Sequence, residues 1–529
     1  MPRKNSTLNL KVHKTMRRTI IFCSSILLCL IVVSGCAIKP TPFTGPEATD
    51  MARDLQGRVH VQQEQFPQVL TLDEAIARTM KYNLEHRVKM YEANLRQRQY
   101  DLSLYDMLPD ITAKGQAEHR SNDDASRSKN LSTGVTSNDY TTSEDRTKRT
   151  GSISLSWNIL DLGINYYTLH QQANRYLMAK EQQRKVVQDI VSETRGMFLK
   201  VLVAQQLKDD VDKTLLQAEE ALAKARQIET ERLRPLEQVL VYQRGLIQTI
   251  KQLEELQRDL ALAKVQLAAL MNMPANRLPR LVAPSWYGTI ITLHAHPSML
   301  EEYAFAHRPE IIQWGYQKRI TALEAKKAIF DLVPGIGLNL SSDYSSNSYD
   351  LHSAWQQASA NVAYNLMNIV KWPAKKKMFE VQEHVEDAQG LAVGMAVLTQ
   401  VHLAWQQHLF SAQNHARAQQ LAEVDERLKA LSTLQVQQRQ GIMLDSIQKS
   451  AAAIVGRLNR EQALINHYEA MGNVYNSIGV DYLDAANLPE ELAELTRTIA
   501  DANGKLWTQA DLGALLSSPA PTTTNGQNQ

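Results

Sequence analysis

The sequence predicts an α+β membrane protein in which long, antiparallel, coiled-coil-like helices join four short strands, and the strands of several chains complete one β-barrel. Three observations predict this fold: a pattern that occurs twice, a change of apolar period from 3.6 to 2 residues within each copy, and helices of matching length in the two copies. The 529 residues are 43% apolar and 22% charged, so the chain can bury a large core.

Residues 1–35 are expected to form a lipoprotein signal peptide. Basic residues precede an apolar run over residues 19–33, which is too short to be a comfortable mature membrane span. The run ends in Val33-Ser34-Gly35-Cys36, which resembles a bacterial lipoprotein box, where small residues give the peptidase access to the bond before a lipidated cysteine. We therefore expect an acyl chain such as palmitate on Cys36. A simple secretory peptide is the alternative, and Met16 is an alternative start.

The net charge of the mature chain argues against a nucleic-acid partner, and its cysteine content argues against disulfides and thiolate metal sites. Removal of residues 1–35 removes six of the 58 basic side chains and none of the 56 acidic ones, which leaves a net charge of −4. This balance implies no nucleic-acid partner. Cys36 is the one cysteine that remains, so neither a disulfide framework nor a thiolate metal site is expected.

The pattern of residues 71–272 returns in residues 298–480. Tyr82-Asn83-Leu84-Glu85 corresponds to His307-Arg308-Pro309-Glu310 at an offset of 225 residues. Trp157-Asn158 then corresponds to Tyr364-Asn365 at an offset of 207, because the first copy has the longer loop. Each copy is expected to contain a helix, two strands, one very long helix, a break and a further helix.

Three segments lie outside the two copies. Residues 36–70 are expected to be an extended N-terminal segment. Four prolines indicate that residues 273–297 form an extended linker between the copies. Residues 481–529 contain one short amphipathic pattern near residues 489–499, and their polar end is expected to be a disordered tail.

The helical segments have lengths that fit a wall of uniform height. Apolar residues recur at steps of three and four, for example at Leu421, Val424 and Leu428, as in coiled coils. At a rise of ~1.5 Å per residue, residues 164–233 and 370–440 would each form a rod of roughly 105 Å. Residues 73–107 and 236–271 would each form a rod about half as long, so two short helices stacked end to end match one long helix.

Four short segments are expected to be strands with one apolar and one polar face. Ile153, Leu155 and Trp157 alternate with serines, which is the alternation of a strand between lipid and an aqueous interior. The mature chain has no run of the ~20 apolar residues that a spanning helix needs, so a β-barrel is the expected way to cross a membrane. The four segments are residues 111–118, 152–159, 336–340 and 358–365.

Four strands cannot close into a membrane barrel, because their open edges would leave unpaired backbone groups in hydrocarbon. Several chains must therefore share one barrel. The polar loop over residues 120–148 is expected in water at the barrel rim. Trp157, Tyr364 and Trp372 lie where strands meet helices and are candidates for a membrane-interface girdle. Simple packing is the alternative for each of these aromatic residues.

The chain resembles the TolC family of outer-membrane efflux and secretion channels over roughly residues 71–480. The motifs that carry the resemblance are Leu72-Asp73-Glu74-Ala75-Ile76, Leu108-Pro109, Trp157-Asn158-Ile159-Leu160-Asp161-Leu162-Gly163 and Arg308-Pro309-Glu310. The resemblance implies a homotrimer in the outer membrane of a Gram-negative bacterium, with a 12-stranded transmembrane β-barrel joined to a long antiparallel α-helical barrel in the periplasm.

The resemblance also implies the partners and the mode of action. Such a channel takes its substrate from an inner-membrane pump of the RND or ABC type through a periplasmic adaptor, as in tripartite efflux or type I secretion. It conducts the substrate passively to the exterior, so no catalytic residue and no cofactor are expected. Outer-membrane lipid is the other expected partner.

The breaks near residues 232–235 and 437–445 are expected to form the periplasmic tip, because Pro235 and Gly441 interrupt the long helices. The resemblance implies that the adaptor docks there and that carboxylates just past the turn can ring the tunnel mouth. Asp445 is the gate candidate, and Glu237 stands at the matching position of the first copy. A carboxylate that only favours the start of its helix is the alternative reading of Asp445.

Other motifs favour no further activity. His294 and His296 lie in the Pro-rich linker without the spacing of a closed metal site. The basic run over residues 371–377 follows a strand, which favours a membrane-interface anchor over a nucleic-acid patch. The chain carries no nucleophile elbow or phosphate loop. The rival function is a periplasmic coiled-coil scaffold lipoprotein without a pore.

Overall fold

The computed structural model describes residues 41–59, 63–231, 235–438, 443–481, 483 and 488–508. Cys36 and Gly441 therefore lie outside the described residues, and so does the expected tail beyond residue 508. The chain divides into two compact units, residues 1–61 and residues 62–529.

The first unit contains the helix α2 (Gly45–Val59), although the sequence predicted an extended segment over residues 36–70. That prediction is wrong over α2 because a capping box starts the helix. The backbone amide of Thr44 donates to Glu47 at 2.9 Å, and the amide of Glu47 donates in return to the Thr44 hydroxyl at 3.5 Å. Met51 and Leu55 are exposed on this helix.

The second unit begins with the first copy of the repeat. Its helices are α3 (Leu72–Tyr82), α4 (Leu84–Tyr105), α5 (Ile159–Thr230) and α6 (Leu236–Leu270). Its strands are β1 (Val69–Leu70), β2 (Asp110–His119), β3 (Ala125–Ser126), β4 (Thr141–Thr142) and β5 (Thr147–Asn158). The long loop thus contains a small hairpin, β3–β4, and β5 begins before the expected end of that loop.

The second copy has its helices and sheet strands in the same order as the first. Its helices are α7 (Pro297–His307), α8 (Pro309–Ile329), α9 (Met367–Gln437) and α10 (Met443–Ile478), with a short turn η2 (Phe330–Leu332). Its strands are β6 (Arg280–Leu281), β7 (Gly335–Ser345) and β8 (Ala354–Ala363). The helix α11 (Leu492–Thr508) follows the second copy.

The first helical segment of each copy is broken, whereas the sequence predicted one continuous rod. In the first copy the break lies at Asn83, whose extended backbone ends α3 and whose side chain accepts the amide hydrogen of His86 at the start of α4. In the second copy it lies at the matching position, Arg308, before Pro309 at the start of α8. An N-cap side chain or a proline begins a new helix more readily than it continues an old one.

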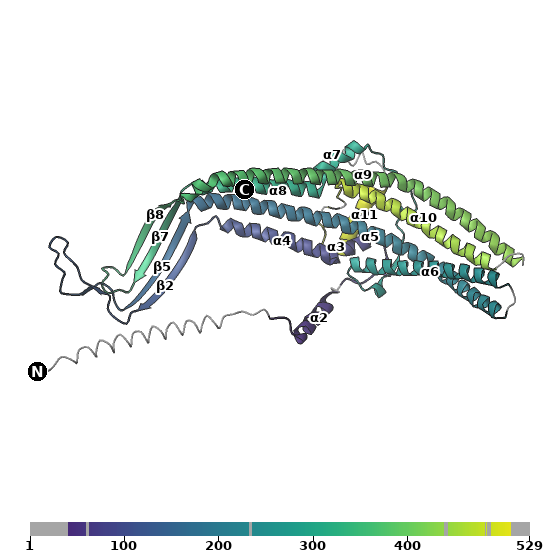
Figure 1. The fold of residues 1–529 in the computed structure, drawn as a ribbon, viewed down its shortest axis with the longest axis horizontal. Helices are drawn as coiled ribbons and strands as arrows, with labels where there is room; N and C mark the ends of the chain where they lie inside the picture. The colour runs from purple at the N-terminus through teal and green to yellow at the C-terminus, as the bar shows by residue number, and fades with distance from the viewer. Residues whose placement is uncertain are drawn as a thin grey trace. The chain divides into compact units, whose positions relative to one another are not determined.

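The strands β2, β5, β7 and β8 form one antiparallel sheet in that order, which lies at one end of the long helices (Figure 1). The register places apolar residues opposite apolar ones and polar residues opposite polar ones. Leu155 lies opposite Ile111 and Leu340, and Ser156 lies opposite Asp110 and Asn339. The predicted two-faced strands are therefore confirmed, with longer bounds than expected. Tyr364 follows β8 instead of lying within it.

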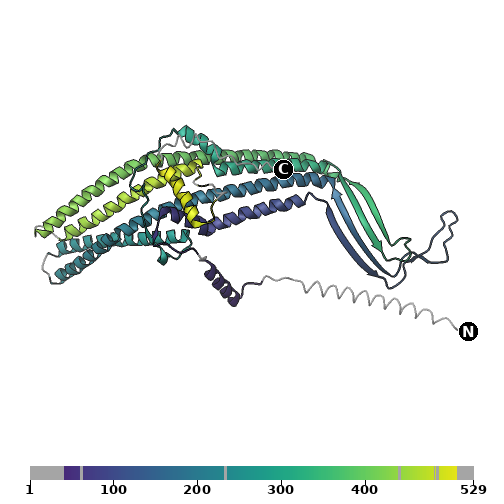
Figure 2. The same ribbon diagram turned by 180° about the vertical axis from the view of Figure 1, so that it is seen from behind.

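The helices form a layer whose order matches that of the strands. Next to the sheet, contacts join α4 to α5, α5 to α8, and α8 to α9. Farther from the sheet, α6 contacts α5, α5 contacts α10, and α10 contacts α9 (Figures 1 and 2). The main core lies between these two regions, where Phe198, Tyr468 and Tyr475 are fully buried.

The linker and the C-terminal segment are more ordered than the sequence predicted. The linker contains a short turn η1 (Ala275–Arg277) and the strand β6, which pairs in parallel with β1. The helix α11 is longer than the expected pattern and packs on α3. Trp507 near its end is 1% exposed and stacks on Trp286 of the linker at 4.8 Å, so aromatic packing orders both segments.

Candidate functional site

One face of the four-stranded sheet is apolar and exposed. Ile111 on β2 is 75% exposed and Val362 on β8 is 71% exposed, and neighbouring apolar residues on β5 and β7 share their face. Serine, asparagine and lysine side chains occupy the opposite face, for example Lys114, Ser152 and Asn361. A sheet with two exposed faces of opposite polarity suits a position between lipid and water.

The sheet has two open edges. Within the described residues, β2 and β8 pair with a strand on one side only. Each of the three neighbouring pairs is antiparallel, so β2 and β8 run in opposite directions. The edge strand β8 of one copy can therefore pair with β2 of another and continue the antiparallel sheet.

The same two edges continue into the helical layer. The helix α4, which leads into β2, carries an apolar stripe at steps of three and four, and these side chains are exposed: Leu84, Val88, Tyr91, Leu95, Leu102 and Tyr105. The helix α9, which follows β8, carries a second exposed stripe near the sheet, at Met378, Val381 and Val385. Exposed apolar stripes with coiled-coil spacing on both edges suit packing against further helices.

The predicted tip residues Pro235, Glu237 and Asp445 lie at the starts of α6 and α10, at the ends of the helices far from the sheet (Figure 1). Pro235 caps the start of α6 without a side-chain hydrogen bond, and Glu237 lies in the first turn of that helix. Asp445 lies in the first turn of α10 and forms an ion pair with Lys449 at 2.7 Å. This is the geometry of a carboxylate at a helix start.

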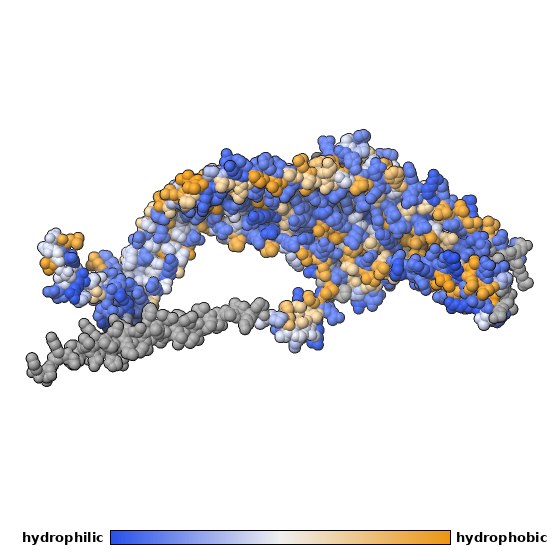
Figure 3. Space-filling model, in the orientation of Figure 1, coloured by the Kyte–Doolittle hydropathy of each residue, from blue (hydrophilic) through white to orange (hydrophobic). Residues whose placement is uncertain are grey.

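A small core holds the three helices of the tip together. Ala218 and Ala221 of α5 pack with Leu246 of α6 and Ile447 of α10. Gly245 allows α6 and α10 to approach closely, because a Cβ there would lie 2.4 Å from the side-chain nitrogen of Gln448. The tip is therefore a packed unit, and Figure 3 shows apolar surface over the ends of its helices.

The predicted interface aromatics lie on three different elements at the junction of sheet and helices. Trp157 lies on the apolar face of β5 opposite Leu338, and it is 41% exposed. Tyr364 follows β8, and Trp372 lies near the start of α9, and both are half-buried. Tyr167 of α5, which the sequence also places where a strand meets a helix, has its ring 5.6 Å from that of Phe330.

The linker is held to the helices by buried polar groups. The backbone amide of Leu293 donates to Nε2 of His408 on α9 at 3.2 Å, and His467 Nε2 on α10 lies 3.0 Å from the backbone oxygen of Ile291. The two imidazole rings stack at 5.3 Å. Tyr468 bonds to the backbone of Trp286, Gly288 and Thr289.

Burial sets the protonation of this linker anchor. Burial and the neighbouring His467 lower the pKa of His408 to about 4, and burial lowers the pKa of His467. Burial raises the pKa of Tyr287, and so do the hydrogen bond that Tyr287 donates to Glu461 and the nearby hydroxyl of Tyr468. His408 and His467 are therefore neutral at pH 7, and their hydrogen bonds to the backbone of Leu293 and Ile291 hold the linker on α9 and α10.

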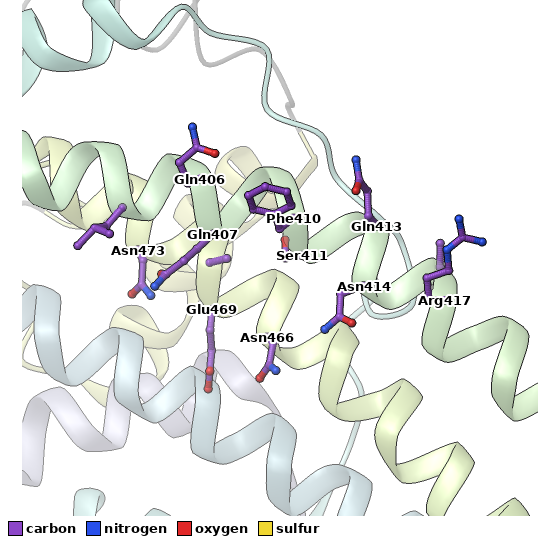
Figure 4. Close-up of a pocket in the computed structure, with 13 residues that line it drawn as sticks. Gln406, Gln407, Phe410, Ser411, Gln413, Asn414, Arg417, Asn466, Glu469 and Asn473 are labelled. Atoms are coloured by element: carbon purple, nitrogen blue, oxygen red, sulfur yellow. The ribbon is translucent and has the colours of Figure 1, made fainter.

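An open cavity of about 1030 Å³ lies between α9 and α10. Figure 4 shows Gln407 and Asn473 directed into the same space between these helices. The wall contains six side-chain amides and the charged groups of Arg417 and Glu469. Amides donate and accept hydrogen bonds without a net charge, so this wall holds water and neutral polar groups. The amides belong to Gln406, Gln407, Gln413, Asn414, Asn466 and Asn473.

The described residues contain no group of three or more histidine, cysteine or acidic side chains that could hold a metal ion. His296, from the motif considered in the sequence, caps α7 by accepting the amide hydrogen of Ser298. Within the part of the chain that the structure describes, no helix is both long and apolar enough to cross a membrane.

Comparison with known proteins supports the fold. No family model and no curated protein matches the sequence. Among solved structures, the chain matches the Campylobacter jejuni CmeC outer membrane channel with a TM-score of 0.60 and 11% identity, over 81% of this chain and 89% of that one. It matches the open state of the Neisseria gonorrhoeae MtrE outer membrane channel with a TM-score of 0.57 and 14% identity, over 80% and 94%.

A third match is the outer membrane protein VceC from Vibrio cholerae, with a TM-score of 0.57 and 12% identity over 77% of this chain and 96% of that one. The fold of this chain is therefore that of these outer-membrane channels, the TolC-family fold. Several outer-membrane channels match it along most of their length.

Proposed function

We propose that this protein is the outer-membrane channel of a tripartite efflux or type I secretion system. Three copies would form a 12-stranded transmembrane β-barrel and a helical tunnel in the periplasm. The channel would conduct substrate passively from an inner-membrane pump of the RND or ABC type and a periplasmic adaptor to the exterior. Cleavage after residue 35 and lipidation of Cys36 would anchor each chain to the outer membrane.

One observation carries this proposal: a two-faced sheet with two open edges continues into a helical layer whose edges carry exposed apolar stripes. A single chain would leave the backbone groups of both edge strands unpaired in lipid, at a cost of several kcal/mol for each group. Pairing β8 with β2 of the next copy removes both edges and also covers the stripes on α4 and α9. The number three comes from the resemblance to the TolC family.

The tunnel and its mouth follow from the same arrangement. We assign the amide-lined wall between α9 and α10 to the tunnel interior, because its six side-chain amides can bind water and neutral polar groups. The tips of α5, α6, α9 and α10 would meet the adaptor. Threefold repetition would place three copies of Asp445 near the mouth, where a ring of carboxylates would favour cations.

The mass of the detergent-solubilised full-length protein tests this proposal. Light scattering should give three chains, electron microscopy should show an elongated hollow particle, and insertion into a planar bilayer should give stable conductance steps. A monomeric or solid particle without conductance would contradict the channel and favour the periplasmic scaffold.

A further inference from the structure

A cavity of about 330 Å³ lies between α8 and α9, next to the sheet. The two helices are held together on both sides of this cavity. On the side away from the sheet, the indole of Trp314 donates to the backbone oxygen of Glu386 at 2.8 Å. On the side of the sheet, Lys375 forms an ion pair with Asp331, and Asn368 donates to the Asp331 backbone oxygen at 2.9 Å. Thr321 and Lys318 of α8 also contact Glu386 and Asp387 of α9, and the cavity lies between these contacts and those of Asp331.

The part of the cavity nearest the sheet is apolar. Trp372 lies near the start of α9, and Ile329 comes from the last turn of α8, shortly before β7 begins, while Phe379 lies about two turns farther along α9. The small side chains of Ala322 and Ala325 leave room opposite the two aromatic rings. An apolar wall of this kind suits a hydrocarbon chain.

The charged residues of the cavity are ordered along the helix axis. On α9, Trp372, Lys376 and Glu380 follow one another at steps of four residues, which places them on one face at intervals of about 6 Å. Lys326 of α8 lies on the wall with Lys376, and Glu383 lies beyond Glu380. From the sheet outward, the α9 wall therefore carries Trp372, then Lys376 and Phe379, and then Glu380 and Glu383. Lys376 lies 3.8 Å from Glu380, and Lys318 of α8 lines the acidic end, where it forms an ion pair with Asp387.

The innermost wall contains a buried carboxylate. Glu386 is 6% exposed, and its Oε1 accepts a hydrogen bond from the hydroxyl of Thr321 at 2.9 Å. Its Oε2 has no hydrogen-bond partner among the described residues. A buried carboxylate oxygen without a donor favours a cationic group in the neighbouring cavity.

We propose that this cavity binds a phospholipid with an ethanolamine headgroup. The acyl chain lies along Trp372 and Ile329, the phosphate contacts Lys326 and Lys376, and the ammonium group points toward Glu380 and Glu383. This inference rests on the proposed function, because it needs the sheet in the membrane so that the chain can leave the cavity directly into lipid. A volume of about 330 Å³ holds the headgroup and the first part of one chain.

The charge order selects among membrane lipids. Lys318 at the acidic end is already paired with Asp387, so an anionic lipid with an uncharged headgroup would bring no cation for the glutamates. A choline headgroup has the positive charge but no N–H to donate to a carboxylate, whereas ethanolamine donates charge-assisted hydrogen bonds. Ethanolamine lipid is therefore the preferred ligand.

Native mass spectrometry of the full-length protein tests this inference, with equal amounts of dioleoyl phosphatidylethanolamine, phosphatidylglycerol and phosphatidylcholine added to the detergent. We expect one ethanolamine lipid retained per chain. The double variant Lys326→Gln/Lys376→Gln should lower its affinity about tenfold or more, because two charged contacts to phosphate are lost. Lys371→Gln/Lys377→Gln, which removes two nearby lysines outside the cavity, should bind as the wild type does.

Three results would overturn the inference. The first is equal retention of the three lipids, and the second is an equal effect of the two double variants. The third is binding of tetraphenylphosphonium in place of lipid, which would assign the cavity to an organic cation. The same spectra give the number of chains, so a trimer without selective lipid refutes this inference alone, whereas a monomer refutes the proposed function.

Discussion

Single buried residues of this protein hold its linker and its C-terminal helix in place. His408 is 2% exposed and accepts a hydrogen bond from the Leu293 amide through Nε2, so its proton lies on Nδ1. Arg195 of α5 lies over the ring of Trp507 at 4.6 Å, on the same indole that stacks on Trp286. These contacts join segments that are far apart in the sequence.

The linker anchor makes stability depend on pH. The pKa of His408 is about 4 in the folded chain and 6.5 in the unfolded chain, so the unfolded chain binds more protons between these values. The contribution of His408 is therefore complete above pH 6.5 and is lost as the pH falls toward 4. Between pH 7 and pH 5 we expect a loss of about 2 kcal/mol from this residue.

Thermal unfolding of the wild type and of His408→Gln at pH 7 and pH 5 measures this contribution. Glutamine keeps an acceptor near the position of Nε2 but does not titrate. Between pH 7 and pH 5, the melting temperature of the variant should fall by less than that of the wild type. Equal losses in the two proteins would show that other groups, such as His415 or His467 nearby, dominate the pH dependence.

At the scale of elements, the exposed stripe on α4 is the clearest sign that the chain is incomplete by itself. Leu95 is 57% exposed although it continues a coiled-coil pattern, whereas Ala93 on another face of α4 is buried. The edge strand β2 follows this helix directly. An apolar stripe and an open strand edge on the same side of one chain favour a second copy as the partner.

Leu95→Lys should weaken assembly and leave the folding of the single chain intact. The side chain is exposed in one chain, so its loss removes burial only at the interface between copies, which should lower the association constant about tenfold or more per interface. Gln97→Lys is the matched control, because it introduces the same side chain at an exposed position off the stripe. The measurement is the fraction of trimer in native gels after extraction at low protein concentration. Equal trimer fractions in both variants would exclude α4 from the interface.

At the scale of the whole molecule, the fold separates a conduit from a lipid-anchored scaffold. Its sheet presents one apolar face and one polar face, and its order of strands and helices matches that of outer-membrane channels over more than three quarters of the chain. A scaffold needs long helices but has no use for such a sheet. The membrane position of the protein should therefore depend on the sheet more than on the acyl chain.

Fractionation of Cys36→Ser tests this difference in cells. The variant should remain in the outer-membrane fraction after a carbonate wash and should need detergent for release, because a closed sheet stays in lipid without an acyl anchor. A variant with lysines at Ile153 and Leu155 on the apolar face is the control and should fail to insert. Release of Cys36→Ser by carbonate would support the scaffold.

The sequence by itself determined the duplication, the strands with one apolar face and the lengths of the long helices. These properties are local, because alternation in β5 or steps of three and four in α9 are set by residues a few positions apart. The sequence also placed Pro235, Glu237 and Asp445 at the starts of α6 and α10, which the helix bounds support.

Only the tertiary structure decided which residues lie together across the chain. The break at Asn83, the pairing of β1 with β6 and the burial of Trp507 depend on contacts between segments that are hundreds of residues apart or on a single capping side chain. The same holds for the stripes on α4 and α9. A periodic apolar stripe has the same spacing whether its own chain buries it, as with Val211 of α5, or leaves it exposed, as with Leu95 of α4. Burial depends on the neighbours in space, and spacing alone does not specify them.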